Sequence, residues 1–476
     1  MPELEAIIGL EVHAQMNTKT KMFCGCDNDA FGKEPNTTVC EICMGHPGTL
    51  PVPNKEAIVK AAKAALALHC AVNRRSHFDR KHYFYPDLPS GFQISQYDFP
   101  LASKGNVRYD LNGNEMICGI TRLHIENDAG KLTHRGSVTL CDYNRAGTPL
   151  MEIVTEPDLR SAEEAVAFAE ELRRTLIAVN ASEADMFKGM MRFDASVSLR
   201  EKGTEKLNPR SEIKNLNSFK ALEKALRYEE ARLRKSWKET GGPLPGDITV
   251  GWLDDEGKTR LLRDKETADD YRYFPEPDIP PLVMDEDRVA EIRRQLPASP
   301  REKKQEYVEM GLASAEATIL VEQPAIRALF DAVQTKTRDA KRASGMILTQ
   351  LMGFLNAEGK TPSDVPSVND MLDLVDAIDA GTISGNSGKT VLEKMVATGK
   401  APKDIIAAEG MGQISDDAKI EALVKEAIAK NPKAIEDYKN GKQAALGAIV
   451  GYVMKMTNGQ ANPGKVNKLL QKALKK

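Results

Sequence analysis

The sequence predicts an α+β protein in which a mainly antiparallel sheet is followed by a helical part and a small helical tail. Three observations predict this fold class. Up to about residue 290, strand-like runs alternate with turns rich in Gly and Pro. From about residue 301 to 408, apolar residues recur with the period of an α-helix. The chain has 476 residues, which is too long for one hydrophobic core and indicates two to four domains.

The first part contains the predicted strands, and two helices interrupt them. The segment Asn54 to Leu68 is rich in Ala, which favours a helix. The segment Ser161 to Ile177 begins with a Ser cap followed by Glu163 and Glu164, as the start of a helix favours. The strand-like runs lie at 7–13, 117–124, 138–142, 150–154 and 191–199.

Two breaks divide the rest of the chain. Pro297 and Pro300 lie too close together for a continuous helix, so they end the first part. Gly410-Met411-Gly412 separates the helical part from the tail. From Met411 to Lys476 the chain has twelve lysines, no arginine and six acids, hence a charge of +6, whereas the remainder carries −9. A basic tail that follows an acidic main part indicates that the two parts have different functions. The positive charge of the tail is suited to binding nucleic acid.

The composition is that of a globular protein. Hydrophobic residues make up 41% and charged residues 28%, and no apolar run approaches the ~20 residues that span a bilayer. The start of the sequence is acidic and lacks the basic and apolar segments of a secretory signal. Thiols in a metal-site pattern, rather than a disulfide framework, agree with a reducing compartment. We therefore expect a cytoplasmic protein.

Four cysteines occur as two close pairs, Cys24 with Cys26 and Cys40 with Cys43. Two close thiol pairs on tight turns can reach the corners of one tetrahedron, which is the geometry of a structural zinc site. Incidental buried thiols are the alternative, and they account well for the other three cysteines. The segment offers no general base and no open coordination position. The sequence therefore predicts a structural Zn²⁺ knuckle at about residues 22–46, with catalysis elsewhere.

Carboxylates and imidazoles recur at alternate positions of the predicted strands. Glu11 and His13 are two residues apart on one strand, so both side chains emerge on the same face. The same spacing relates His124, Glu126 and Asp128. Taken singly, each could be a solvated strand residue. Together with Asp194 and Glu212 on two further strands, and with neighbouring cations such as Lys214, they form an oxygen-rich set suited to Mg²⁺ and the phosphates of ATP.

Six longer motifs resemble those of one family, the B subunits of aspartyl/glutamyl-tRNA amidotransferase. They are GLEVH at 9–13, DRKHYFYPD at 79–87, QISQ at 93–96, NRAGTPLMEIV at 144–154, EIKNLNSF at 212–219 and DYRYFPEPD at 270–278. The resemblance covers essentially the whole chain. It implies a catalytic cradle domain similar to the glutamine synthetase fold at 1–294, a helical domain at 295–409 and a tRNA-binding tail domain at 410–476.

The resemblance also implies an activity and partners. The family works as a heterotrimer with an amidase subunit (A) and a small subunit (C). Ammonia released from glutamine by the amidase would reach the B subunit, a ligase that forms a carbon–nitrogen bond. This subunit would use ATP to phosphorylate the side-chain carboxylate of misacylated Glu-tRNA(Gln) or Asp-tRNA(Asn), and ammonia would then displace the phosphate. Which of the two tRNAs is used cannot be read from the sequence.

The resemblance assigns candidate site residues through the matching motifs. The Mg²⁺ and ATP candidates are Glu11, His13, Glu126, Asp194 and Glu212, with Asp128 as an additional acid. The candidate cations for phosphate or substrate are Arg80, Lys81, Arg145 and Lys214. The chain departs from the motifs of the family at two positions near this set. The family often has a second acid where this chain has Asn127, and it often has Asn where this chain has Ser196. If the second acid is a ligand, Asp128 has to replace it.

Two other functions are weaker alternatives. A ligase acting on free amino acids, like glutamine synthetase, would share the carboxylates but has no use for a basic tail. A zinc-stabilised RNA-binding scaffold leaves the carboxylate-bearing strands unexplained. The run Gly385 to Thr390 ends like a phosphate-binding loop, but Ile383 stands where that motif needs Gly, and no strand precedes it. We therefore expect it to begin a helix rather than to bind phosphate.

Overall fold

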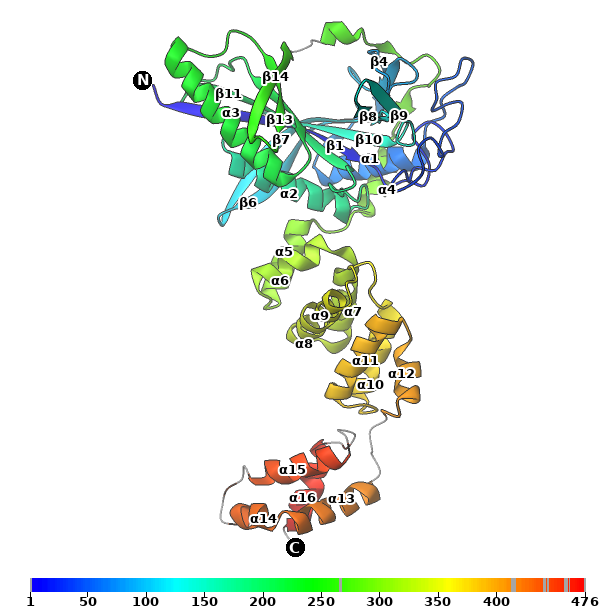
Figure 1. Ribbon diagram of the computed structural model, residues 1–476, viewed down its shortest axis with the longest axis vertical. Helices are drawn as coiled ribbons and strands as arrows, with labels where there is room; N and C mark the ends of the chain where they lie inside the picture. The colour runs from blue at the N-terminus through cyan, green and yellow to red at the C-terminus, as the bar shows by residue number, and fades with distance from the viewer. Residues whose placement is uncertain are drawn as a thin grey trace. The chain divides into compact units, whose positions relative to one another are not determined.

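The computed structural model describes residues 2–264, 268–411, 417–439, 442, 445–457, 461 and 463–474. The chain forms two compact units, Met1–Glu302 and Lys303–Lys476. The first contains a large, mainly antiparallel sheet with helices, and the second is helical throughout its described elements (Figure 1). The predicted α+β class is confirmed. The three-domain division with boundaries at 294 and 409 stays a prediction, and parts of the proposed tail, Gly412 among them, lie outside the described residues.

Nine strands form the central sheet in the order β14-β13-β12-β11-β1-β10-β7-β6-β2. Only β12 and β13 pair in parallel, and all other neighbours are antiparallel. The strands are β1 (Leu4–Gln15), β2 (Ala71–Val72), β6 (Ala102–Leu111), β7 (Asn114–Asn127), β10 (Pro149–Thr155), β11 (Met191–Glu201), β12 (Ser211–Leu216), β13 (Ile248–Leu253) and β14 (Lys258–Asp264). Every predicted strand is present, with ends that extend by zero to three residues.

Alternation along β1 explains which face of the sheet is buried. Leu10, Val12 and Ala14 are buried in one apolar cluster with residues of the helices α1 (Lys55–Ala67), α2 (Ala162–Ala178) and α3 (Phe219–Thr240). These helices cover one face of the sheet (Figure 1). The intervening side chains of β1 point to the opposite face. The hydrophobic core therefore occupies the helical side, and the other side is free for polar chemistry.

The caps of the first two helices agree with the sequence. Asn54 accepts hydrogen bonds from the backbone of Glu56 (2.9 Å) and Ala57 (3.2 Å), and Ser161 accepts one from Glu164 (3.2 Å). Both predicted helices are confirmed to within one residue at each end.

Smaller sheets border the central one. A three-stranded sheet has the order β15-β4-β5, and β3 pairs with β16, as β8 pairs with β9. These strands are β3 (Arg75–Ser76), β4 (Asp79–His82), β5 (Phe92–Ser95), β8 (Lys131–Arg135), β9 (Val138–Asp142), β15 (Phe274–Pro275) and β16 (Leu282–Val283), and a short 3₁₀ helix, η1 (Ala268–Tyr271), precedes β15. Strand β4 of this three-stranded sheet carries Arg80 and Lys81, two of the predicted cations.

The break predicted at Pro297 and Pro300 lies between α4 (Glu286–Arg294) and α5 (Pro300–Glu309). Later elements are α6 (Ser314–Glu322), α7 (Pro324–Thr337), α8 (Ala340–Ser344), the π-helical η2 (Gly345–Leu351), α9 (Met352–Ala357), α10 (Val368–Asp379), α11 (Gly385–Thr398), α12 (Pro402–Ala408), α13 (Asp417–Lys430), α14 (Pro432–Lys439), α15 (Ala445–Met456) and α16 (Pro463–Leu474). They enclose two separate apolar clusters, one among α5–α12 and one among α13–α16.

Two further observations bear on function. Ser384 caps α11 by accepting a hydrogen bond from the backbone of Ser387, so the run at Gly385 begins a helix, as expected. Among the helices of the described residues, none is at once long and apolar enough to cross a bilayer.

Candidate active site

Ionisable side chains form a row across four neighbouring strands on the face of the sheet opposite the helices α1, α2 and α3. His13 on β1 pairs in register with Glu152 on β10 and with Arg192 on β11, and Glu152 pairs with His124 on β7. Paired residues of adjacent antiparallel strands share a face. The strand register therefore gathers two imidazoles, one carboxylate and one guanidinium from distant parts of the sequence.

Carboxylates surround both imidazoles. His13 Nε2 lies 3.4 Å from Glu152 Oε2, 3.6 Å from Glu11 Oε1 and 3.9 Å from Glu126 Oε1. His124 Nε2 lies 3.4 Å from Glu152 and 3.6 Å from Glu126. Burial disfavours a charged imidazole, but Glu152 and then Glu126 outweigh it and raise the pKa of His124 to about 9. In return, His124 and His13 outweigh burial and hold the pKa of Glu152 well below its usual value.

Glu152 is a site residue that the sequence analysis missed. It is 4% exposed and lies between His13 and His124, and Arg122 Nη2 is 3.6 Å from its other oxygen. A signal was available, because Glu152 is the only charged residue in a strand that is otherwise apolar except for a terminal Thr. A carboxylate in such a strand needs a partner, since a buried unpaired charge is costly.

A second row lies beside the first. Glu11 on β1 is in register with Asp194 on β11, and Lys214 Nζ on β12 lies 2.9 Å from both Asp194 and Glu212. Burial lowers the pKa of Lys214, but the two carboxylates outweigh it, so its pKa is raised. The carboxylate of Glu152, together with burial, raises the pKa of Glu11. Lys214 thus ties Glu212 to Asp194 at the end of this row.

Two sets of side chains could each hold a metal ion. In each set, one ligand atom per residue lies within 4.8 Å of the others; the sets are Glu11, His13 and Asp194, and His13, Glu126 and Glu152. The donors are mainly carboxylate oxygens, which suit Mg²⁺, with one shared imidazole nitrogen. The residues therefore fit a divalent cation at either position.

Asp128 lies at the edge of this group rather than inside it. It accepts hydrogen bonds from Gln15 (2.9 Å) and Arg192 (3.1 Å), and Arg145 Nε is 3.6 Å away. Burial raises the pKa of Asp128, but Arg192 and Arg145 outweigh it and bring the pKa to about 2. Its charge is therefore already balanced by cations, and it belongs to neither metal-competent set.

The other predicted cations have different surroundings. Arg80 donates to both oxygens of Glu276 (2.6 and 2.9 Å) and to Asp278 (3.3 Å). Arg145 donates to the backbone carbonyls at 129 and 130. Lys81 lies 4.8 Å from the centre of the Tyr271 ring, and Glu126 raises the pKa of Lys81 against the effect of burial. Of the cations on β4, the charge of Lys81 therefore faces the carboxylates, and Arg80 is occupied by a salt bridge.

The four paired cysteines come together as expected. Their sulfur atoms all lie within 4.8 Å of one another, a separation that one metal ion can bridge. A hydrogen bond from Cys24 brings the pKa of Cys43 to about 5, although burial raises it, with smaller contributions from Cys40 and Lys21. The same hydrogen bond raises the pKa of its donor, Cys24, so zinc would have to displace the Cys24 proton on binding.

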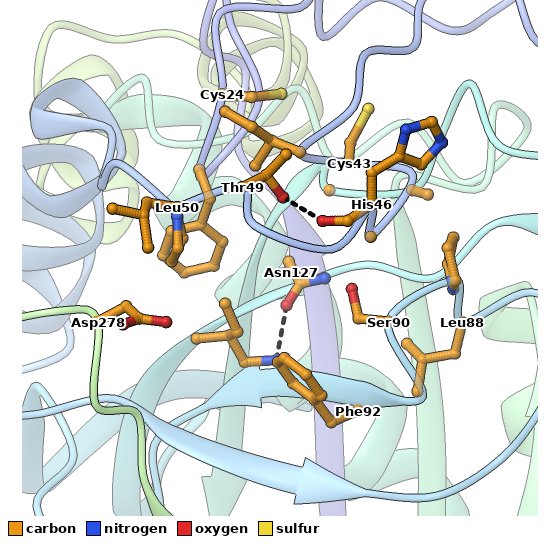
Figure 2. Close-up of a pocket in the computed structure, with 18 of the residues that line it drawn as sticks. Cys24, Cys43, His46, Thr49, Leu50, Leu88, Ser90, Phe92, Asn127 and Asp278 are labelled. Atoms are coloured by element: carbon orange, nitrogen blue, oxygen red, sulfur yellow. Dashed lines mark hydrogen bonds between the residues drawn. The ribbon is translucent and has the colours of Figure 1, made fainter.

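Two cavities adjoin these groups. One, of about 370 Å³, has Cys24 and Cys43 on one side and Phe92 and Asn127 on the other (Figure 2), and Asp128 also lines it. The second, of about 460 Å³, is lined by Glu11 and Arg122 together with hydroxyl-bearing residues of β10 and β11. The cysteine knuckle and Glu11 of the second row therefore each border a cavity of the first unit.

Comparison with known proteins identifies the family of the chain. The model of the GatB/GatE catalytic domain matches residues 6–290, and that of the GatB domain matches residues 328–474. The B subunit of the aspartyl/glutamyl-tRNA(Asn/Gln) amidotransferase of Moorella thermoacetica is 46% identical over 99% of this chain and 100% of its own length. Those of Caldicellulosiruptor bescii and Persephonella marina are also 46% identical, over 100% and 99% of this chain and all of their own length. The chain belongs to the family of aspartyl/glutamyl-tRNA(Asn/Gln) amidotransferase B subunits.

Proposed function

We propose that this chain converts misacylated Glu-tRNA(Gln), Asp-tRNA(Asn) or both into Gln-tRNA(Gln) and Asn-tRNA(Asn), with ATP as the energy source. The observation that carries the proposal is the pair of metal-competent sets around His13, which lie on one open face of the sheet. Phosphoryl transfer needs metal ions and cations around the transferred group, and this face offers carboxylates for the first and Lys81, Lys214 and Arg192 for the second.

The reaction has two steps. A side-chain carboxylate oxygen of the aminoacyl group attacks the γ-phosphorus of ATP, the bond to ADP breaks, and an acyl phosphate forms. Ammonia then attacks the acyl carbon, loses a proton to a carboxylate of the face, and phosphate leaves. Glu11, His13 and Asp194, or His13, Glu126 and Glu152, would hold Mg²⁺, which would supply positive charge to the phosphate oxygens. The cavity lined by Glu11 and Arg122 is the space beside these ligands for part of the nucleotide.

The remaining candidate residues have supporting roles in this proposal. Glu212 holds Lys214 beside Asp194. Asp128 orients Arg192 in the first row. Arg80 and Arg145 stay proposed cations for phosphate or substrate, and each already donates to acceptors of the protein, so that role requires an exchange of partner.

The proposal includes partners and a compartment. The chain itself would receive ammonia from an amidase subunit that hydrolyses glutamine, and a small third subunit would complete a heterotrimer in the cytoplasm. The enzyme is then a ligase that forms a carbon–nitrogen bond with glutamine as amido donor. The four cysteines would hold a structural Zn²⁺.

The tail at 410–476 would contact tRNA. Its described lysines include Lys455 on α15 and Lys468 on α16, both exposed. Lysine is a flexible point charge suited to phosphate contacts that do not depend on base sequence. This division leaves the chemistry to the first unit.

One assay tests the proposal against its alternatives. The chain, its amidase partner, misacylated tRNA, ATP, Mg²⁺ and glutamine are combined, and amidated aminoacyl-tRNA is measured after hydrolysis of the ester. ATP-dependent formation of Gln-tRNA or Asn-tRNA is expected. Amidation of free glutamate or aspartate without tRNA would favour the free-amino-acid ligase, and tRNA binding without amide formation would favour the scaffold.

A further inference from the structure

Lys21 is a fully buried lysine next to the cysteine cluster. Its side chain is 0% exposed, and its ammonium has two neighbours. Lys21 Nζ donates to Cys43 Sγ at 3.6 Å and to the carbonyl of Tyr143 at 3.3 Å. The lysine therefore ends between the knuckle and the turn at residues 143–148.

A buried ammonium needs an anionic partner, because transfer of an unpaired charge out of water costs several kcal/mol. In the part of the chain that the structure describes, no carboxylate forms an ion pair with Lys21. A carbonyl oxygen supplies only a dipole. The negative charge opposite Lys21 must therefore come from sulfur, and Cys43 Sγ is the sulfur within reach.

The cysteine cluster, with zinc bound, would carry the negative charge that Lys21 needs. Four thiolates outnumber the two positive charges of Zn²⁺ by two, so the centre would be a half-buried dianion. Such a centre is stabilised by hydrogen bonds and cations outside its ligands. We propose that Lys21 is the counter-ion of this centre, and that it joins the centre to the turn at residues 143–148, beside the carboxylate rows.

Several contacts make that turn continuous with the knuckle. The backbone of Met22 donates to Gly147 (2.8 Å), and Asn144 accepts from the backbone of Thr38 (2.9 Å). Gly147 has φ +88°, and a Cβ there would lie 3.4 Å from both Cys43 Cβ and Lys21 Cδ, so the turn packs directly on the pair.

The same turn reaches the candidate active site. Gly147 N donates to the carbonyl of Asp128 (2.9 Å), and the Asp128 carboxylate holds Arg192 of the first row. This second half of the inference rests on the proposed function, because only then is Arg192 part of an active centre. Lys21 is thus a positioning residue, with no contact to the reacting groups.

Lys21→Met in the full-length chain tests the inference, with Lys60→Met as the matched control. Lys60 is also buried, at 7% exposed, but its ammonium donates to Asn17 (2.7 Å) and to the carbonyl of Asn180 (2.6 Å) and contacts no sulfur. Zinc content is measured by elemental analysis, and zinc release under excess chelator is followed with a chromogenic indicator. Lys21→Met is expected to release zinc about 10-fold faster or more, and Lys60→Met at the wild-type rate.

Hydrogen exchange supplies a second readout. The amides of Gly147 and Thr148 should exchange faster in Lys21→Met than in Lys60→Met, because the turn loses its attachment. If Lys21→Met does not accumulate as folded protein, Lys21→Gln keeps a hydrogen-bond donor without the charge, and the same comparison applies. Equal zinc-release rates in the Lys21 variant and the Lys60 variant would overturn the inference. So would wild-type protein without stoichiometric zinc, whereas the tRNA amidation assay judges the proposed function independently.

Discussion

Replacing Glu152 by glutamine removes the carboxylate shared by His13 and His124 while keeping the shape of the side chain. The surroundings of His124 raise its pKa from the ordinary histidine value of 6.5 to about 9, and Glu152 contributes most to the rise. The whole shift corresponds to roughly 3 kcal/mol, which is the net result of burial and of the two carboxylates that oppose it. The metal-free chain with Glu152→Gln should therefore lose stability below the ordinary histidine pKa, by an amount comparable to the roughly 3 kcal/mol of the whole shift.

The sign of the pH dependence follows from the raised pKa. A group whose pKa is higher in the folded state stabilises the fold fully below its unfolded value of 6.5, and this contribution disappears as the pH rises through about 9. The difference between wild type and Glu152→Gln should therefore be large at about pH 6 and small at about pH 9.5.

Urea unfolding followed by tryptophan fluorescence measures this difference. The two tryptophans of the chain, Trp237 and Trp252, both lie in the core of the first unit, so the signal reports the unit that carries the site. Glu170→Gln is the control, because the half-exposed Glu170 pairs with Arg174 on the same helix, an arrangement worth about 0–1 kcal/mol. Equal destabilisation by Glu152→Gln at both pH values would refute the reasoning.

The remaining predictions concern activity, metal and tRNA. Glu126→Gln and Asp194→Asn should each lower ATP-dependent amidation by roughly 10² or more, because a metal ligand loses its charge, while glutamine hydrolysis by the partner persists; unchanged amidation would remove that residue from the site. Cys24→Ser should lose zinc and the local stability of the knuckle, measured by elemental analysis and thermal unfolding, and wild-type protein without zinc would contradict this. A chain ending at Ala408 should bind tRNA more weakly and with a shallower salt dependence, because phosphate contacts that release counterions are gone. Equal affinities and equal slopes across a salt series would show that Lys442, Lys455, Lys465 and Lys468 do not serve tRNA.

The local sequence pattern was sufficient to predict the fold class and the placement of the two site residues on β1. The two-residue spacing of Glu11 and His13 predicts a shared face, and β1 presents both on the open side of the sheet. Helix caps such as Ser161 depend on neighbours in sequence, so the helix starts were predictable as well.

Partners from distant strands could not be predicted in the same way. Glu152 gains its role from register with His13 and His124, and nothing within β10 encodes which strands become its neighbours. Arg80 was expected to face phosphate, but its salt-bridge partner Glu276 comes from a segment far along the chain. Lys21 gave no signal at all, because a lysine in a loop normally lies in solvent.

The placement of β1 has a consequence for synthesis of the chain. Its two neighbours in the sheet, residues 149–155 and 191–201, lie much farther along the chain and are translated later. Until both have been translated, β1 has no hydrogen-bonded neighbours and its apolar face has no sheet to complete. The site around His13 therefore cannot assemble until residues 191–201 have been translated.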